Sequence, residues 1–400
     1  MKKVALTECG QYDIDLVKKS LEELFCLLGY DQANPLGNII KPGMRVFIKP
    51  NWVASRWRQS CSHSGNIYSV ITHPSIVEAV ADYVAIALHG KGEIIIGDNP
   101  SIDADFNELM QLIGILKLET KYNIPCKIMD LRPFICDDLK KYGKKELMTA
   151  QRGDPLGFVE VNLAEKSMLY NCNPRLFRGI FDDRRDTINS HKGNKQMYSF
   201  SGSLYNADVY ISIPKMKTHH KVGTTLNLKG LVGSIANKNQ LVHWKLGFPL
   251  IGGDEYPNFI HWFRGLFAKV KERGAWYGND TIWRMVVDLY NAFMQGERKY
   301  FSIVDGIIAG EKKGPFCPYE KQASVLIAGE DLLAVDIATT RLMGFLPNKI
   351  KYLKHFLDNQ YIQLQDIQFM SNSIGTNAIF ESNDPYYNFS PPEGWENIKV

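Results

Sequence analysis

The sequence lacks closely spaced cysteines and long apolar segments. Its seven cysteines include no Cys-x-x-Cys pair, which argues against a disulfide framework, a zinc ribbon or a ferredoxin-type cluster. We therefore expect no iron–sulfur cluster, and we expect most cysteines to be small buried residues. No stretch approaches the roughly eighteen uninterrupted apolar residues of a membrane helix, so no transmembrane segment is predicted.

The chain also has little excess of positive over negative charge. Lys and Arg number 47 against 43 Asp and Glu, a net charge of +4, and no basic block of the kind that follows a phosphate backbone occurs. We therefore expect no nucleic-acid partner. The N-terminal "MKKVALTECGQYD" has too few apolar residues for the core of a signal peptide, and the expected location is cytoplasmic.

The sequence signatures of familiar enzyme classes are missing. There is no Walker A loop, no G-x-G-x-x-G, no H-E-x-x-H and no G-x-S-x-G. The function must therefore be inferred from the arrangement of polar residues along the chain.

Apolar segments of strand length alternate with helical segments. "MRVFIKPN", then a helical stripe over residues 75–88, then "EIIIGDNP" repeat this β–α–β rhythm. Continuous apolar strands between amphipathic helices predict an α/β fold, with a mainly parallel sheet covered by helices on both faces.

We expect residues 1–350 to form one large α/β domain. A polar excursion over 136–200 and an aromatic helical hairpin over 256–295 interrupt the rhythm of this domain. Residues 351–400 are expected to form a C-terminal helix and an extended tail.

Charged and polar residues follow four of the predicted strands. In open parallel sheets, ligands bind outside the carboxyl ends of the strands, so we expect these residues to line one cleft. They are Lys49 and Asn51, Asp98, the group Lys215, Lys217 and His219, and Asp305.

The segment "ISIPKMKTHHKVGTTLNLKGLVGSI" (211–235) contains the densest group. After Gly223, a short helical run over 226–231 is predicted, and its N-terminus beside Lys215 and Lys217 would bind an anion through backbone N–H groups. Asn227 and Lys229 are candidates for the same pocket, and His243 for closing over it. Lys221 is interpreted as a solvated turn residue.

Six segments carry a resemblance to a known family. They are "VFIKPNWV", "THPSIVEAVADYV", "IIIGDNP", the segment 211–235, "SIVDGIIAGEKKGP" and "LIAGEDLLAVDIATTRLMG". The chain resembles the bacterial and archaeal family called domain of unknown function 362 over about residues 40–350.

This resemblance implies no settled activity. Many members of the family carry a ferredoxin-like cluster module, which would suggest redox or metal chemistry, but the cysteines here lack its pattern. The chain therefore resembles a subgroup without that module, and "GAWYGNDTIWR" is similar to a subgroup found in surface-polysaccharide gene neighbourhoods.

Our leading hypothesis is an enzyme of unknown reaction type that acts on a small phosphorylated or carboxylated substrate. Lysine supplies a point charge and can act as a nucleophile or base, and an imidazole titrates near neutrality. The predicted catalytic residues are His219 and Lys217. The predicted substrate-binding residues are Lys49, Asn51, Lys215, Asn227, Lys229 and His243.

Two further hypotheses stay open. In the first, Asp98 and Asp305 hold a divalent metal as cofactor through their oxygens. In the second, the chain is a non-catalytic accessory or partner protein of a redox or surface-polysaccharide assembly system. Residues 256–295 would then contact a peripheral membrane surface or a protein partner, rather than pack on the chain's own core.

Overall fold

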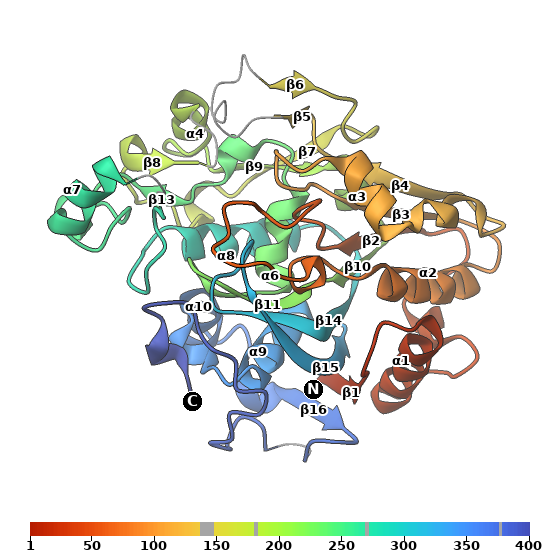
Figure 1. The fold of residues 1–400 in the computed structure, drawn as a ribbon. Coiled ribbons are helices and arrows are strands. Elements are labelled where there is room, and N and C mark those ends of the chain that lie inside the picture. The colour runs from red at the N-terminus through yellow and green to blue at the C-terminus, as the bar shows by residue number, and fades with distance from the viewer. Residues whose placement is uncertain (137–147, 180–182, 269–271, 376–377) are drawn as a thin grey trace.

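The computed structural model describes residues 1–136, 148–179, 183–268, 272–375 and 378–400. Its centre is a ten-stranded sheet of order β16-β1-β15-β14-β10-β2-β3-β4, with β11 and β12 attached beside β14 (Figure 1). Neighbours from β14 to β4 are parallel, whereas β15 is antiparallel to both of its neighbours. The fold is therefore the mainly parallel α/β architecture that the sequence predicts.

The strands divide between this sheet and three small two-stranded sheets. The large sheet contains β1 (Lys2–Glu8), β2 (Arg45–Pro50), β3 (Glu93–Asp98), β4 (Cys126–Asp130), β10 (Val209–Ile213), β11 (Lys215–His219), β12 (Gly223–Thr225), β14 (Lys299–Glu311), β15 (Tyr319–Gly329) and β16 (Ile367–Ser371). The small sheets pair β5 (Phe134–Ile135) with β6 (Thr149–Ala150), β7 (Phe158–Asn162) with β9 (Met197–Ser201), and β8 (Phe177–Arg178) with β13 (Trp244–Lys245).

Helices cover both faces of the large sheet. The α-helices of the described residues are α1 (Ile14–Leu28), α2 (Pro74–Leu88), α3 (Phe106–Ile113), α4 (Arg184–Ser190), α5 (Gly202–Tyr205), α6 (Asn227–Gly230), α7 (Phe259–Phe267), α8 (Ile282–Phe293), α9 (Leu332–Leu342) and α10 (Lys351–Asp358). Successive side chains of a strand point to opposite faces, so Val46 and Ile48 enter the core beneath α1 and α2. Phe47 enters the core that contains α8 and α9.

The two helices predicted between 256 and 295 are present, but they lie in different environments. Val286, Leu289 and Phe293 of α8 are fully buried, and α8 contacts α6 and α10. In α7, by contrast, only Gly265 is buried. α8 is thus a core helix and α7 a projecting one.

The last fifty residues do more than form a helix and a tail. α10 follows residue 350 as expected, but β16 then pairs in parallel with β1, Lys2 opposite Ile367. Both β1 and β16 lie at one edge of the sheet and were not predicted. The division of the chain into domains stays a prediction.

Two of the cysteines are paired, contrary to the expectation from their spacing. Cys61 and Cys317 form a disulfide across a sequence separation of 256 residues, which no local spacing rule can detect. Cys9, Cys126 and Cys136 are buried, Cys172 is half-buried and Cys26 is exposed. None of the described helices has the length and apolar character needed to cross a bilayer.

Candidate functional site

A buried ion pair joins the ends of β2 and β3. The Lys49 ammonium lies 2.8 Å from Asp98 Oδ1, and both side chains are 4% exposed. The Asp98 carboxylate also accepts the N–H groups of Trp52 and Asn99 at 2.7 and 2.9 Å. Gly233 covers this pair so closely that a Cβ atom would lie 2.4 Å from Asp98 Oδ1, so a larger residue there would displace the pair.

A second buried ion pair joins β11 and β14. Lys215 Nζ lies 2.7 Å from Asp305 Oδ2, with both side chains 0% exposed. Tyr12 completes this group: its hydroxyl accepts from Lys215 at 2.7 Å and donates to Asp305 Oδ1 at 2.9 Å. The His73 N–H donates to the second carboxylate oxygen at 3.0 Å, and the His73 ring stacks on Tyr12. Burial lowers the pKa of Lys215 to about 8, and Asp305 opposes this effect.

Four more lysines at this edge have no carboxylate partner among the described residues. Lys217 Nζ donates to the carbonyls of Val70 and Pro315 at 2.6 and 3.2 Å. Burial, followed by repulsion from Lys215 and Lys229, lowers the pKa of Lys217 well below that of an ordinary lysine. The Lys217 ammonium is therefore positioned by the chain but is not neutralised by it.

Lys229 and Lys238 are two of the four lysines whose pKa values lie far below that of an ordinary lysine. Within the described ranges, Lys229 has no hydrogen bond or ion pair, although only 8% of the residue is exposed. Lys238 donates to the Val232 and Asn99 carbonyls at 3.0 and 3.3 Å. Burial lowers both pKa values to about 7, and repulsion from Lys49 contributes in each case.

Lys221 is not the solvated turn residue expected from the sequence. Its ammonium lies 4.9 Å from the centre of the Trp244 ring, a cation–π contact. Burial lowers its pKa to about 8, with Asp254 opposing that effect. We call Lys217, Lys221, Lys229 and Lys238 the unpaired lysine cluster.

Two histidines beside this cluster are neutral and carry their protons on different nitrogens. His219 Nδ1 accepts the Lys221 N–H at 3.1 Å, so the ring proton of the neutral form lies on Nε2. His243 Nδ1 lies 2.8 Å from the Leu241 carbonyl, which requires a proton on Nδ1 and leaves Nε2 as an acceptor. Burial lowers both pKa values well below that of an ordinary histidine, and Lys229 contributes to both shifts.

The predicted anion site at the N-terminus of α6 is occupied by the chain itself. The Asp336 carboxylate accepts the N–H groups of Asn227 and Leu228, each at 2.9 Å. The Asn227 side chain donates to Asp336 and accepts from Ser302 at 2.8 Å. The side chain of Asn227 and the first two N–H groups of this helix thus already have partners within the described chain, and a role for Asn227 in substrate binding stays a prediction. Burial raises the pKa of Asp336 to about 7.

Asn51 also has a partner within the chain. Its side-chain amide donates to the Val70 carbonyl at 2.7 Å, the same carbonyl that Lys217 contacts. Asn51 and Lys217 thus fix the segment around Val70 at the edge of the site.

Asp98 and Asp305 do not fit the metal site considered from the sequence. The carboxylates accept hydrogen bonds from lysine, backbone or tyrosine groups on both oxygens, and these donors would have to leave before a cation could bind. Among the described residues, no group of three or more His, Cys, Asp or Glu side chains has a metal-binding arrangement. No step of the proposed chemistry is therefore assigned to a metal.

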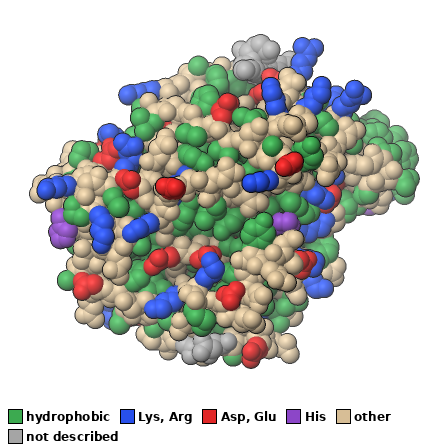
Figure 2. All heavy atoms as spheres, turned by 180° about the vertical axis from the view of Figure 1, so that it is seen from behind, with side chains coloured by type: hydrophobic (Ala, Val, Ile, Leu, Met, Phe, Trp, Pro, Cys, Tyr) green, Lys and Arg blue, Asp and Glu red, His purple; other side chains and the backbone are tan. Residues whose placement is uncertain are grey.

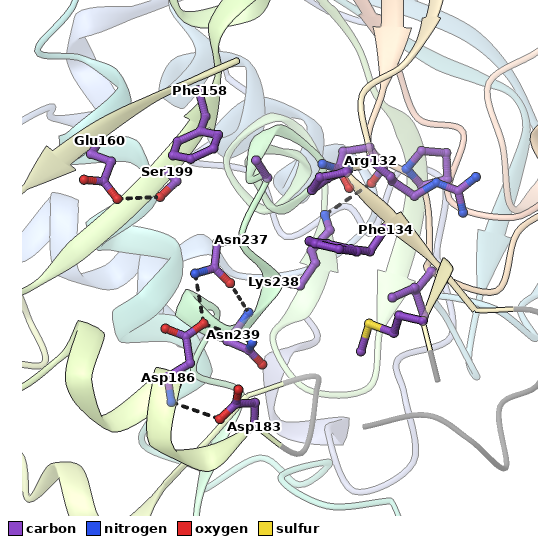
Figure 3. Close-up of a pocket in the computed structure, with 16 residues that line it drawn as sticks. Arg132, Phe134, Phe158, Glu160, Asp183, Asp186, Ser199, Asn237, Lys238 and Asn239 are labelled. Carbon is purple, nitrogen blue, oxygen red and sulfur yellow. Dashed lines mark hydrogen bonds between the residues drawn. The ribbon is translucent and has the colours of Figure 1, made fainter. Parts of the chain in front are cut away.

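A cavity of about 220 Å³ adjoins the cluster at Lys238 and Asn99 (Figure 3). Its wall combines aromatic side chains with charged ones. None of the ten predicted site residues is among the described residues that line it. The cavity is connected to the site through Lys238, a member of the unpaired lysine cluster, and through Asn99, the neighbour of Asp98. The main lining residues are Asn99, Arg132, Phe134, Phe158, Glu160, Asp186, Lys238 and Asn239.

Two amide oxygens at this cavity are buried without a partner. Asn99 donates its side-chain N–H to the Ile235 carbonyl at 3.0 Å, and Asn239 donates to Asp186 at 3.0 Å. Within the described chain, the Oδ1 atoms of both residues accept no hydrogen bond. Buried acceptors are normally satisfied, so these two atoms indicate a missing donor.

Several residues of the site could not be identified from the sequence. Tyr12 follows β1 without any motif and reaches Asp305 from 293 positions away. Lys238 and Asn239 belong to the short helical turn Lys238–Gln240, where nothing in the local sequence distinguishes them from a solvated loop. Asn99 stands with Asp98 at the end of a strand that the sequence predicts, but it was not among the predicted site residues.

The fold and the polar edge define the class as an α/β protein with buried charged groups near the carboxyl ends of parallel strands. The family model for the domain of unknown function DUF362 matches residues 46–152 and 167–341. The chain therefore belongs to this family.

The chain is also similar, at low sequence identity, to three known proteins. A thylakoid-associated protein of Synechocystis is 23% identical over 351 residues, which are 88% of this chain and 77% of that protein. The lactate racemase apoprotein of Thermoanaerobacterium thermosaccharolyticum matches 85% of this chain at 11% identity and a TM-score of 0.39. A Thermotoga maritima protein matches 90% at 10% identity and a TM-score of 0.40. The chain spans 57% and 61% of these two structures, less than two thirds of each.

Proposed function

We propose that this protein is an enzyme acting on a small anionic substrate, phosphorylated or carboxylated, that is bound by the unpaired lysine cluster. One observation carries the proposal: within the described residues, four largely buried lysines have no carboxylate partner. Burying an uncompensated charge is costly, and such groups otherwise neutralise or find an opposite charge. A bound anion would supply that charge.

The cavity beside Lys238 is proposed to hold the rest of the substrate. Its aromatic wall suits an apolar or ring-shaped part, and the free Oδ1 atoms of Asn99 and Asn239 would accept hydrogen bonds from substrate hydroxyl or amino groups. The volume of about 220 Å³ restricts the substrate to a small molecule.

The two neutral histidines supply candidates for hydrogen bonding to the substrate. His243 presents an unprotonated Nε2 that can accept a hydrogen bond from the substrate, whereas His219 presents an N–H donor at Nε2. Lys217, held by two carbonyls with a strongly lowered pKa, is suited to act as a neutral amine. His219, predicted from the sequence as a catalytic residue, is thereby proposed to act as a hydrogen-bond donor.

Thermal unfolding with a panel of anions tests the binding. Phosphate, sulfate and sugar phosphates are expected to raise the unfolding temperature of the parent, and the shift should be lost in Lys229→Met. Lys127→Met is the matched control, because Lys127 is exposed and pairs with Glu93. If no anion stabilises the parent, or if Lys229→Met responds as the parent does, the proposed site is wrong.

Conversion of the bound ligand would distinguish an enzyme from a non-catalytic binding protein. A non-catalytic accessory of a redox or surface-polysaccharide assembly system would bind the anion without converting it. Incubating the protein with a stabilising ligand and analysing the mixture by mass spectrometry distinguishes the two. The location also remains a proposal: we favour the cytoplasm, although the Synechocystis relative is named for its association with the thylakoid.

A further inference from the structure

Helix α7 presents its apolar residues to solvent instead of to the core. Its five large apolar exposed residues recur at helical spacing and form one continuous stripe. Trp262 is half-buried, and Gly265, packed against the Tyr256 ring, is the buried residue of the helix. The exposed fractions are 55% for Phe259, 60% for Ile260, 51% for Phe263, 49% for Leu266 and 76% for Phe267.

A neighbouring turn extends this stripe. Leu250 and Ile251 of the turn Pro249–Ile251 are 91% and 56% exposed. The Phe248 ring lies 5.8 Å from the Phe259 ring, which places the turn beside α7. We call residues 248–268 the α7 lobe; it projects at the left of Figure 1, and in Figure 2, seen from behind, apolar side chains gather on the projecting right-hand edge.

The exposed charge of the α7 lobe is positive, because its carboxylates are buried and its arginine is not. Its two carboxylates, Asp254 and Glu255, are 1% and 5% exposed, and Glu255 pairs with Arg273 at 2.9 Å. Arg264, within α7, is exposed. The lobe therefore has an apolar surface and no exposed carboxylate.

Two further arginines lie beside the α7 lobe. The Leu246 N–H donates to the Leu176 carbonyl at 2.8 Å, which brings Arg175 next to the start of the lobe. The Arg184 guanidinium donates to the Arg175 carbonyl at 2.5 Å, and both side chains are exposed. The apolar stripe thus has a basic border.

We propose that the α7 lobe docks on the surface of an anionic lipid bilayer. Phe263, Phe267 and Leu250 would enter the boundary between headgroups and acyl chains, while Arg264, Arg175 and Arg184 would contact the lipid phosphates. The basic border favours this occupant over a second copy of the chain, because a copy would bring like charges together, whereas an anionic bilayer offers the opposite charge.

Vesicle co-sedimentation tests the inference. The full chain is mixed with phosphatidylcholine vesicles or with vesicles that also contain phosphatidylserine. We expect pelleting with the anionic vesicles and less with the neutral ones. The double variant Phe263→Glu, Phe267→Glu should lower the partition coefficient at least about tenfold. Leu116→Glu, which changes a 49% exposed leucine away from α7, should leave partitioning unchanged.

Each other outcome overturns the proposal. These outcomes are absence of pelleting by the parent, equal pelleting of the double variant and the parent, and equal loss in Leu116→Glu. Light scattering without lipid tests for a protein interface at the same surface. If the parent is a dimer, the double variant is a monomer and the parent does not pellet with vesicles, the surface binds a second copy of the chain. Circular dichroism verifies that every variant is folded.

Discussion

The buried lysines at the carboxyl edge of the sheet fall into two groups with different partners. Lys49 and Lys215 each contact an aspartate at less than 3 Å, whereas Lys217, Lys221, Lys229 and Lys238 contact carbonyls, an aromatic ring or nothing within the described chain. The comparison separates two roles for one residue type. Paired lysines join strands, whereas unpaired lysines lack, within the described chain, an opposite charge that a bound anion is proposed to supply.

The largest expected effect is the loss of a paired partner. Asp305→Asn would leave the fully buried Lys215 without its carboxylate and should reduce the free energy of unfolding by about 3–5 kcal/mol, as measured by urea denaturation at pH 7. Asp358→Asn is the control, since Asp358 pairs with Lys354 on an exposed surface and should change stability by less than about 0.5 kcal/mol. A loss below about 1 kcal/mol for Asp305→Asn would show that this pair does not join the strands.

Removing an unpaired lysine should instead increase the free energy of unfolding. The folded-state pKa of Lys229, about 7 against 10.5 for an ordinary lysine, means that the folded protein binds fewer protons between these pH values. The destabilising contribution of Lys229 is therefore full below pH 7 and disappears as the pH rises towards 10.5. Lys229→Met should be more stable than the parent, on the order of 2–4 kcal/mol at pH 6 and near zero at pH 10.

Urea denaturation at both pH values measures this difference. Lys127→Met, at an exposed and paired position, should show no such dependence on pH. A Lys229→Met protein less stable than the parent at pH 6 would mean that Lys229 has a stabilising partner that this account does not include.

Lys217 should behave differently from Lys229 because it has hydrogen-bond partners. Lys217→Met leaves the carbonyls of Val70 and Pro315 without this donor, and unpaired buried groups cost about 1–3 kcal/mol. At pH 10, where the cost of burying an ammonium is smallest, Lys217→Met should lose about 1–2 kcal/mol, whereas Lys229→Met should match the parent. Equal stabilities of Lys217→Met and Lys229→Met at pH 10 would show that the hydrogen bonds of Lys217 do not stabilise the fold.

The fold was predictable where it depends on the pattern of residues close together in the sequence. The apolar strands up to Asn51 and Asp98, and the helix closed by Gly29 in the left-handed conformation, follow from periodicity and capping. β1 and β16 were missed because β1 gains its stability from pairing with both β15 and β16, and β16 from pairing with β1. α7 and α8 have similar apolar patterns, and only their tertiary contacts distinguish the exposed helix from the buried one.

The site was predictable only as far as strand ends determine it. Lys49 and Asp98 lie at the carboxyl ends of β2 and β3 as expected, and Lys215 follows β10. Asp305, expected at a strand end, lies instead within β14, which continues to Glu311. The sequence could not indicate that Asp336, 109 positions from Asn227, occupies the helix end predicted to bind an anion. Lys238 escaped prediction because its burial depends on packing between distant segments.

The central claim is that an external anion neutralises the unpaired lysine cluster, and isothermal titration with inorganic phosphate at pH 8 tests it most directly. With pKa values of about 7, Lys229 and Lys238 are largely uncharged at that pH, and a bound anion should raise these values. Binding should therefore take up protons, on the order of one per site. The observed heat should then differ between Tris and HEPES buffers, and Lys229→Met should reduce both affinity and proton uptake. Binding with the same heat in both buffers, or no binding at all, would contradict the claim.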